Sequence, residues 1–201
     1  MPKSESNKRI LQGQQTKKAI LEAASRCFAE KGYAACSMDA IAQAAGLSKG
    51  GLYAHFKSKE ELFTLVIKQE HDRAIQRAQA VLEQPPYLDG LIWHMRECIR
   101  NAGFPMDHRL WAEVLAVAGR DPSMKTIFLE SERRSRDFFK ELLRKGIQNN
   151  EINPTLDVEN ISILLFALGD GLIVRIADDP DFDFDRQFKT FETTVRNILK
   201  K

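Results

Sequence analysis

Residues 37–56 read SMDAIAQAAGLSKGGLYAHF, and this stretch decides the fold that we expect for the N-terminal part of the chain. It predicts two short helices, over 38–45 and 49–56, because apolar residues recur at helical spacing on both sides of a break. Ser37 is a suitable N-cap for the first of them. Gly46 tolerates the positive φ that a tight turn needs. The pattern is therefore typical of a helix-turn-helix.

The second of these helices is expected to expose small and polar residues that suit a DNA groove. Lys49 can neutralise a phosphate or donate to guanine, and Tyr53 and His55 can reach phosphates or base edges. The candidate DNA-binding residues, including the starts of neighbouring helices, are Ser37, Ser48, Lys49, Gly50, Gly51, Tyr53, His55 and Lys59. The alternative is an ordinary helical hairpin with a glycine turn. Two adjacent glycines cost a helix about 1 kcal/mol each, which favours the DNA-binding interpretation.

The charge of the chain is unevenly distributed. Residues 1–57 contain nine Lys and Arg against four acids, whereas the remainder contains 21 basic and 24 acidic residues. A basic N-terminal part on an acidic body is typical of a polyanion-binding segment joined to a part with another task. An ordinary solvated surface can show the same imbalance, so the charge alone leaves both interpretations open.

The rest of the sequence has helical periodicity throughout and predicts an all-α protein. We expect an N-terminal three-helix domain (1–58), a connecting helix (59–84) and a larger helical domain (85–201). Ser58 and Glu61 form a capping box at the start of the connecting helix. With the two helices of 37–56, the expected helices number about nine: 17–31 (capped by Thr16), 59–83, 88–102, 107–119, 122–149, 158–177 (capped by Asp157) and 186–200.

Composition excludes several classes of protein. The chain has 201 residues, 43% of them hydrophobic, which supports a substantial core. It contains no run of about 18 apolar residues and no apolar segment near its start, so we expect neither a membrane span nor a secretory signal. Three widely spaced cysteines predict no disulfide framework and no zinc site. We expect a reduced, cytoplasmic protein without metal or cofactor.

Residues 17–67 resemble the N-terminal domain of the TetR family of transcriptional regulators, most clearly in EKGY at 30–33 and SKGGLYAHFKSKEEL at 48–62. The resemblance implies an all-α homodimer with an N-terminal DNA-binding domain and a C-terminal ligand and dimer domain. It implies phosphate contacts for Ser37, Ser48, Tyr53 and Lys59, and a place at the groove for Lys49, Gly50, Gly51 and His55. The family often has Thr at position 51 and a larger polar residue at position 54. Part of the sequence preference is therefore expected to come from DNA shape.

The C-terminal part resembles the family only loosely, in WAEV at 111–114, RDP at 120–122 and ALGDGLIVR at 167–175, which are similar to the choline-responsive repressor subgroup. Aromatic and polar residues of the middle helices predict an effector pocket, with candidates Trp93, His94, Phe104, His108, Trp111, Phe128 and Phe138. Two apolar stripes in the last helices predict a dimer interface, with candidates Ile161, Leu165, Leu168, Leu172, Phe188, Phe191 and Val195. The alternative for each residue is packing within its own subunit.

These observations predict a ligand-responsive repressor that leaves a pseudo-palindromic double-stranded DNA operator when a small molecule with an apolar part binds. Two other classes stay open: an enzyme with a helical pocket, and a scaffold that uses its basic segment on acidic surfaces. The sequence lacks a glycine-rich phosphate loop after a strand, HExxH and GxSxG, so we do not expect an enzyme.

Overall fold

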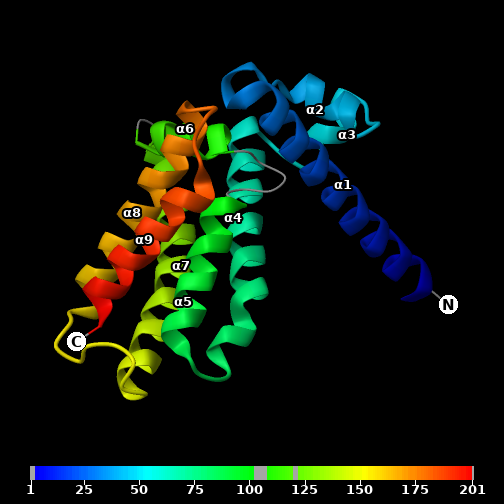
Figure 1. Cartoon of the computed structure of the whole chain (residues 1–201). Coiled ribbons are helices and arrows are strands. Elements are labelled where there is room, and N and C mark those ends of the chain that lie inside the picture. Colours follow the sequence, from blue (N-terminus) through cyan, green and yellow to red (C-terminus); the bar gives the residue numbers. More distant parts are fainter. Residues whose placement is uncertain (1–2, 102–107, 120–121, 201) are drawn as a thin grey trace. The chain divides into compact units, whose positions relative to one another are not determined.

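The computed structural model describes residues 3–101, 108–119 and 122–200, and every regular element in these ranges is a helix. The ranges contain nine α-helices and one short 3₁₀ helix (Figure 1). The expected all-α class with about nine helices is therefore confirmed. The chain divides into two compact units, Met1–Ile67 and Lys68–Lys201, which we call the head and the body. The functional division at residues 58 and 84 stays a prediction.

The head contains three helices and the first half of a fourth: α1 (Lys3–Ala35), α2 (Met38–Ala44), α3 (Lys49–Tyr53) and α4 (Lys59–Ala78). Each contributes to one apolar core through fully buried side chains, namely Phe28, Ile41, Leu52 and Phe63. The rings of Phe28 and Phe63 meet edge to face, with centroids 5.0 Å apart. This core holds the two helices of the 37–56 segment against α1 and α4.

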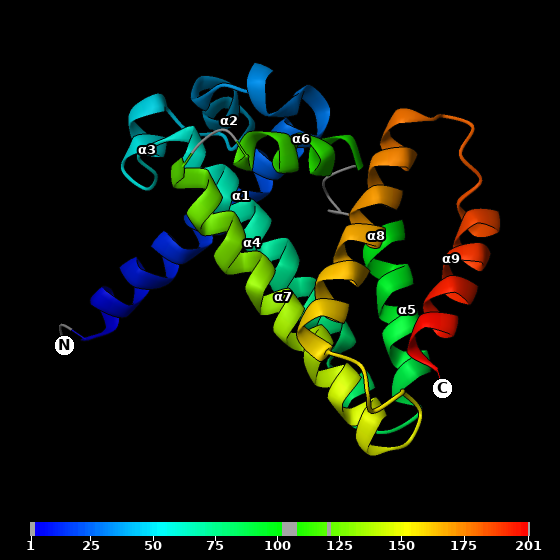
Figure 2. The ribbon, with the colours of Figure 1, turned by 90° about the vertical axis from the view of Figure 1, so that its left-hand side faces the viewer.

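The prediction that the first helix begins at residue 17 is wrong. Figure 2 shows α1 continuing as one long helix towards the N-terminus. The hydroxyl of Thr16 donates to the carbonyl oxygen of Gln12 at 2.9 Å within the helix and does not cap it. No proline interrupts residues 3–16, so the helix has no sequence signal that stops it there. Near its other end, Gly32 takes a non-helical conformation with φ 76° and kinks the helix.

Turn and capping predictions in the head are confirmed. Gly46 has a φ of 68°, the left-handed conformation expected between the two short helices. At the start of α4, the backbone N–H of Glu61 donates to the Ser58 hydroxyl at 3.2 Å, and the Glu61 carboxylate accepts from the Lys57 N–H at 2.7 Å. Two elements are shorter than predicted: α3 ends at Tyr53, and α4 gives way to a 3₁₀ helix (η1, Gln79–Leu82).

The cysteine prediction is corrected in the head. A disulfide joins Cys27 in α1 to Cys36, the residue before the N-cap of α2, and both side chains are buried. Their Cα atoms lie 6.1 Å apart across the Gly32 kink. The kink folds the chain back, so two cysteines nine residues apart come together. Spacing alone gave no sign of this.

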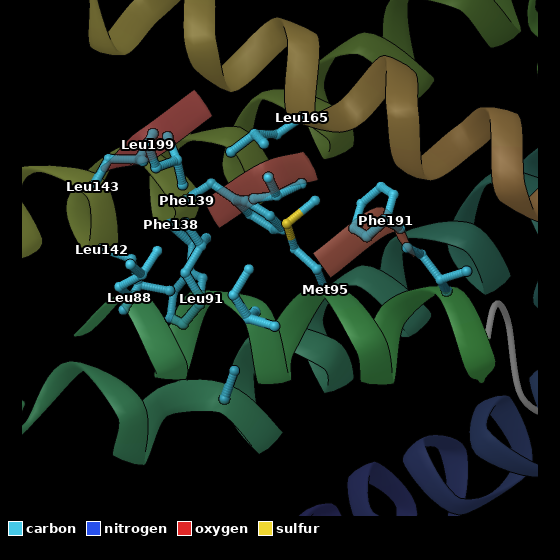
Figure 3. Packing of buried hydrophobic residues seen from close by; sticks show 14 of the residues in the cluster. Leu88, Leu91, Met95, Phe138, Phe139, Leu142, Leu143, Leu165, Phe191 and Leu199 are labelled. Carbon is cyan, nitrogen blue, oxygen red and sulfur yellow. The ribbon is translucent and has the colours of Figure 1, made fainter. Parts of the chain in front are cut away.

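The body is completed by α5 (Tyr87–Arg100), α6 (His108–Ala118), α7 (Pro122–Gln148), α8 (Val158–Asp178) and α9 (Phe184–Leu199). Asp157 caps α8 as predicted, accepting from the N–H groups of Glu159 and Asn160. Asp183 caps α9 and moves its start ahead of the predicted Arg186. Figure 3 shows the shared core, with Leu88, Leu91, Met95, Phe138, Phe139, Leu142, Leu143, Leu165, Phe191 and Leu199 pointing toward one another from α5, α7, α8 and α9.

Helix α8 is more apolar than expected, because the sequence had predicted no segment long and apolar enough to span a membrane. Among the described residues it is the one helix long and apolar enough to cross a membrane, with a mean hydropathy of 1.7 in its most apolar window. Length and composition alone cannot separate such a helix from the core helix of a soluble protein. In the body, Leu165, Gly169 and Ile173 of α8 are buried. These residues pack α8 into the body, and 22% of its most apolar window is buried there.

Candidate DNA-binding surface and ligand pocket

The helix-turn-helix presents most of the predicted DNA-binding residues to solvent. Five of the eight are exposed: Ser37, Ser48, Lys49, Gly50 and Tyr53. Gly51, His55 and Lys59 are half-buried. Apart from the buried Leu52, the short helix α3 therefore consists of small or polar residues that face outward or lie partly exposed. This arrangement supports the predicted surface, and the role of each residue in DNA binding stays a proposal.

The two serines fix the starts of the helices. The Ser37 hydroxyl accepts from the backbone N–H of Ala40 at 3.2 Å, and the Ser48 hydroxyl accepts from the N–H of Gly51 at 3.1 Å. Each hydroxyl keeps its own hydrogen, so each can still donate to a phosphate oxygen. Capping and DNA contact are therefore compatible at both positions.

Glycine at position 50 leaves the outer side of α3 flat. A Cβ added there meets nothing within 4 Å, whereas one at Gly51 lies 3.3 Å from the Ser48 hydroxyl oxygen. The absence of a side chain at Gly50 is thus not required by packing within the head. A glycine here lets another molecule approach the backbone of α3 closely.

Two lysines of the predicted surface already have partners. The Lys49 ammonium lies 2.9 Å from Oδ1 of Asp39, and this hydrogen-bonded ion pair raises the pKa of Lys49. The Lys59 ammonium donates to the carbonyl oxygen of Tyr33 at 2.8 Å and lies 4.3 Å from the centroid of its ring. The Lys59 side chain thus contacts the last turn of α1 in the free protein, and its implied phosphate contact stays a proposal.

A cavity lies within the body, and its empty space, including open solvent at the mouth, is about 790 Å³. Five helices line it: the second half of α4, α5, α6, α7 and α8. Its apolar walls include Ile75, Met95, Ile99, Trp111, Phe139, Leu165, Phe166 and Ile173, and its polar lining consists of Glu70, His71, Arg77, His94, Cys98, Asn101, Ser135 and Asp170. A largely apolar wall with a few inward polar groups is the usual composition of a small-molecule site.

The predicted ligand residues divide into two groups. His94 and Trp111 line the cavity, whereas Trp93, His108, Phe128 and Phe138 are not among the described residues that do, and Phe104 lies outside the described residues. Trp93 is 43% exposed, Phe138 belongs to the core, and a ring nitrogen of His108 is 2.8 Å from the carbonyl oxygen of Ile99. Phe128 reaches the site indirectly, with its ring centroid 6.2 Å from that of Trp111.

Burial controls the protonation of the groups inside the cavity. It lowers the pKa of His71 and of His94 to about 4, so both rings are neutral at pH 7. It raises the pKa of Cys98 to about 12, which leaves the thiol protonated and unreactive. It also raises the pKa of Glu70, although Arg73 forms an ion pair with this carboxylate.

Asp170 is the second carboxyl group of the cavity and has a weaker partner. Its Oδ1 accepts from the Trp111 indole N–H at 3.3 Å, and burial raises its pKa to about 6. The ring of Trp111 in turn meets His71 of α4 edge to face, with centroids 5.2 Å apart. Sequence reasoning missed Asp170, Glu70 and His71. Asp170 is the single acid in the apolar middle of 158–177, and this signal could have identified it.

The predicted dimer residues are also divided by the structure. Leu165, Phe188, Phe191 and Val195 are buried in the core of the body, so their assignment to a subunit interface is corrected. Ile161, Leu168 and Leu172 are partly buried against the same core. Two neighbouring residues of α8, Ile163 and Leu164, are 47% and 42% exposed. The outer face of α8, not its inner stripe, is thus open to a partner.

Two family models match this chain. The family model described as "Bacterial regulatory proteins, tetR family" matches residues 20–66, and the model described as "BetI-type transcriptional repressor, C-terminal" matches residues 100–200. The chain is 29% identical to the transcriptional regulator UidR of Escherichia coli over 165 residues, which span 82% of this chain and 83% of UidR. It is 29% identical to the transcriptional repressor AcnR of Corynebacterium diphtheriae over 182 residues, 89% of this chain and 90% of AcnR.

A solved structure of the regulator FadR from Bacillus subtilis, in complex with stearoyl-CoA, has the same fold. It superposes with a TM-score of 0.76 over 90% of this chain and 98% of that chain, at 22% identity. The two family models together cover most of the head and most of the body, and the second alone spans half of the chain. The chain therefore belongs to the TetR family, whose members are ligand-responsive, DNA-binding transcription regulators.

Proposed function

We propose that this protein is a cytoplasmic homodimeric repressor, which binds a pseudo-palindromic operator with two heads and releases it when a small molecule fills the cavity of the body. The observation that carries the proposal is the composition of α4. Its first half contributes Leu62 and Phe63 to the core of the head, and its second half contributes Glu70, His71 and Ala74 to the cavity wall. One helix therefore contributes both to the core of the head and to the wall of the cavity.

The effector acts through the cavity wall. A ligand that binds one conformation of the dimer better than another shifts the population towards it. His71 of α4 is in ring contact with Trp111, which is held by Asp170, so a ligand that displaces Trp111 also changes the packing of α4. A coupling of about 1–3 kcal/mol changes operator affinity about 5–150-fold.

The polar lining favours an effector that donates hydrogen bonds. Glu70 and Asp170 are acceptors when ionised, and in both the pKa is raised by burial, so each carboxylate gains from a donor. Trp111, Phe139 and Leu165 provide apolar surface beside them. The effector we propose has an apolar part and a hydroxyl or protonated nitrogen directed at Asp170.

The subunit partner is a second copy of the chain. The outer face of α8 exposes Ile163, Leu164, Ala167 and Gly171 along one side, and water contact with such a surface is unfavourable. A single helix-turn-helix makes few contacts, so operator binding needs two heads about one DNA turn, roughly 34–36 Å, apart. Dimerisation through α8 supplies the second head.

DNA binding is tested by fluorescence anisotropy with labelled fragments from upstream of the gene itself, at about 50 and 200 mM salt. We expect saturable binding to one fragment with a steep salt dependence. A protein that binds no fragment at the lower salt concentration contradicts the proposed function.

Effector binding is tested by tryptophan fluorescence, because the two tryptophans of the chain lie in different places. Trp93→Phe removes the exposed indole and leaves Trp111 as the single reporter in the cavity. We expect a saturable change in emission with compounds that also release the DNA fragment. In Trp111→Phe the remaining Trp93 is the control, and its emission is expected to stay constant.

A further inference from the structure

Asp39 and Lys49 form an ion pair on the outside of the head. Asp39 lies in the first turn of α2 and Lys49 is the first residue of α3. The Lys49 ammonium is 2.9 Å from Oδ1 and 3.1 Å from Oδ2 of the carboxylate. Both side chains are largely exposed, at 64% and 63%. The pair thus places a carboxylate beside a lysine that the proposed function assigns to the DNA surface.

We propose that Asp39 is a specificity-determining residue, which weakens the attraction of Lys49 to DNA phosphates in general and so favours the operator over other duplexes. The inference rests on the proposed function, because it requires that α3 meets DNA. Neither the family resemblance nor the comparisons assign a role to Asp39.

The argument starts from the electrostatics of non-specific binding. A protein cation that neutralises a phosphate releases condensed counterions, and each such contact adds about 0.9 to the slope of log affinity against log salt. Lys49 and Asp39 together carry no net charge, so the pair attracts a phosphate far less than a free lysine does. The carboxylate also repels phosphates near it. Asp39 therefore removes about one contact from non-specific binding.

Operator binding is affected less. An ammonium group has three N–H donors, and a carboxylate occupies at most two of them. Lys49 can thus remain paired with Asp39 while its third N–H donates to O6 or N7 of guanine. A base contact of this kind exists only at the right sequence. The operator complex keeps its Lys49 contact, whereas complexes with other duplexes lose theirs. The ratio of operator affinity to non-specific affinity therefore increases.

The test compares Asp39→Asn with the parent protein on two duplexes, the bound upstream fragment and a shuffled sequence of equal length. We expect the affinity for the shuffled duplex to rise about threefold to tenfold, with a salt slope steeper by about 0.9. We expect a smaller change on the upstream fragment, so that the specificity ratio falls. Thermal unfolding of each variant establishes that the head is intact, and Asp39→Ser is the second variant if the first does not fold.

Two controls distinguish the effect of the Asp39–Lys49 ion pair from the effect of removing any negative charge from the head. Glu30→Gln removes the same charge from an exposed acid of α1 in the same head. We expect this variant to change both affinities by less than Asp39→Asn and to leave their ratio constant. In a Lys49→Ala background, Asp39→Asn is expected to keep only the part of its effect that comes from repulsion between the carboxylate and nearby phosphates, because the ion-pair partner is gone.

The outcomes distinguish the two proposals. If the parent protein binds neither duplex at low salt, the proposed function fails. If it binds, and Asp39→Asn matches Glu30→Gln on both duplexes or acts equally with and without Lys49, the role of Asp39 is overturned while the proposed function stands.

Discussion

The head and the body place their polar side chains in opposite positions. In the head, the core is apolar around Phe28 and Phe63, and the functional candidates Lys49 and Tyr53 face solvent. In the body, carboxyl and imidazole groups line a cavity, and burial shifts the pKa of each of them. A surface that meets DNA keeps its charges hydrated until binding, whereas a small-molecule site desolvates them beforehand. The body therefore carries a cost in stability that the head avoids.

The largest effect is expected where the body controls the head through dimerisation. Leu164→Asp places a charge on the exposed apolar face of α8 and is expected to give a monomer. Operator affinity should fall about 10²–10⁴-fold, because two linked heads bind with a high effective concentration. Sedimentation and anisotropy measure the two effects.

Leu129→Asp is the matched control for that variant, because Leu129 of α7 is 44% exposed and Leu164 is 42% exposed. It should remain dimeric and bind the operator as the parent does. A dimeric Leu164→Asp protein would falsify the assignment of α8 to the interface.

The second prediction concerns the stability that the disulfide gives to the head. A cross-link between residues nine apart, Cys27 and Cys36, is expected to stabilise the folded head by about 2–3 kcal/mol through the entropy of the unfolded chain. A reductant should therefore lower the unfolding temperature of the parent protein and leave that of the Cys27→Ala/Cys36→Ala variant unchanged. Alkylation of three thiols in the non-reduced, denatured protein would show that the bond does not form.

Asp170 provides the corresponding prediction for the body. Its pKa is raised from 3.8 to about 6 in the folded state, so the folded protein holds the proton to higher pH than the unfolded chain. Stability contributed by this group is full below about pH 4 and is lost as the pH rises through 6. Asp170→Asn should thus be more stable than the parent by about 1–3 kcal/mol at pH 7, with a smaller difference at pH 5.

The same variant should respond less to the effector, because the amide replaces the proposed carboxylate acceptor. Urea unfolding at the two pH values and effector release of the DNA fragment measure both effects. An Asp170→Asn protein that is equally stable, or that has the same stability difference at both pH values, would contradict the burial argument.

The head was the more predictable unit because its signals are local. The turn at Gly46 and the capping box of Ser58 and Glu61 each depend on residues within a few positions, and both are confirmed. The cysteine prediction failed in the head because it depended on a feature outside the cysteine spacing. Cys27 pairs with Cys36 only because Gly32 kinks α1.

The body was less predictable because its cavity is built from five helices. Periodicity identified which residues are apolar, but it did not tell the inner stripe of α8 from the outer one. Leu165 was therefore assigned to a subunit interface although it is buried, whereas Leu164 beside it is exposed. Which face of α8 is buried depends on the helices that pack against it, and the sequence of α8 alone does not identify them.

The smallest effect is expected from the addition of a single methyl group to the surface of the head. Gly50→Ala should stabilise the protein by about 0.5–1 kcal/mol, because alanine is the better helix former and its Cβ meets nothing within 4 Å. Gly13→Ala in α1 adds a methyl group to equally open space and should stabilise by a similar amount. Only Gly50→Ala should weaken operator binding, since its methyl group lies where α3 approaches DNA. If both variants bind as the parent does, the flat face of α3 at Gly50 is not the surface that enters the groove.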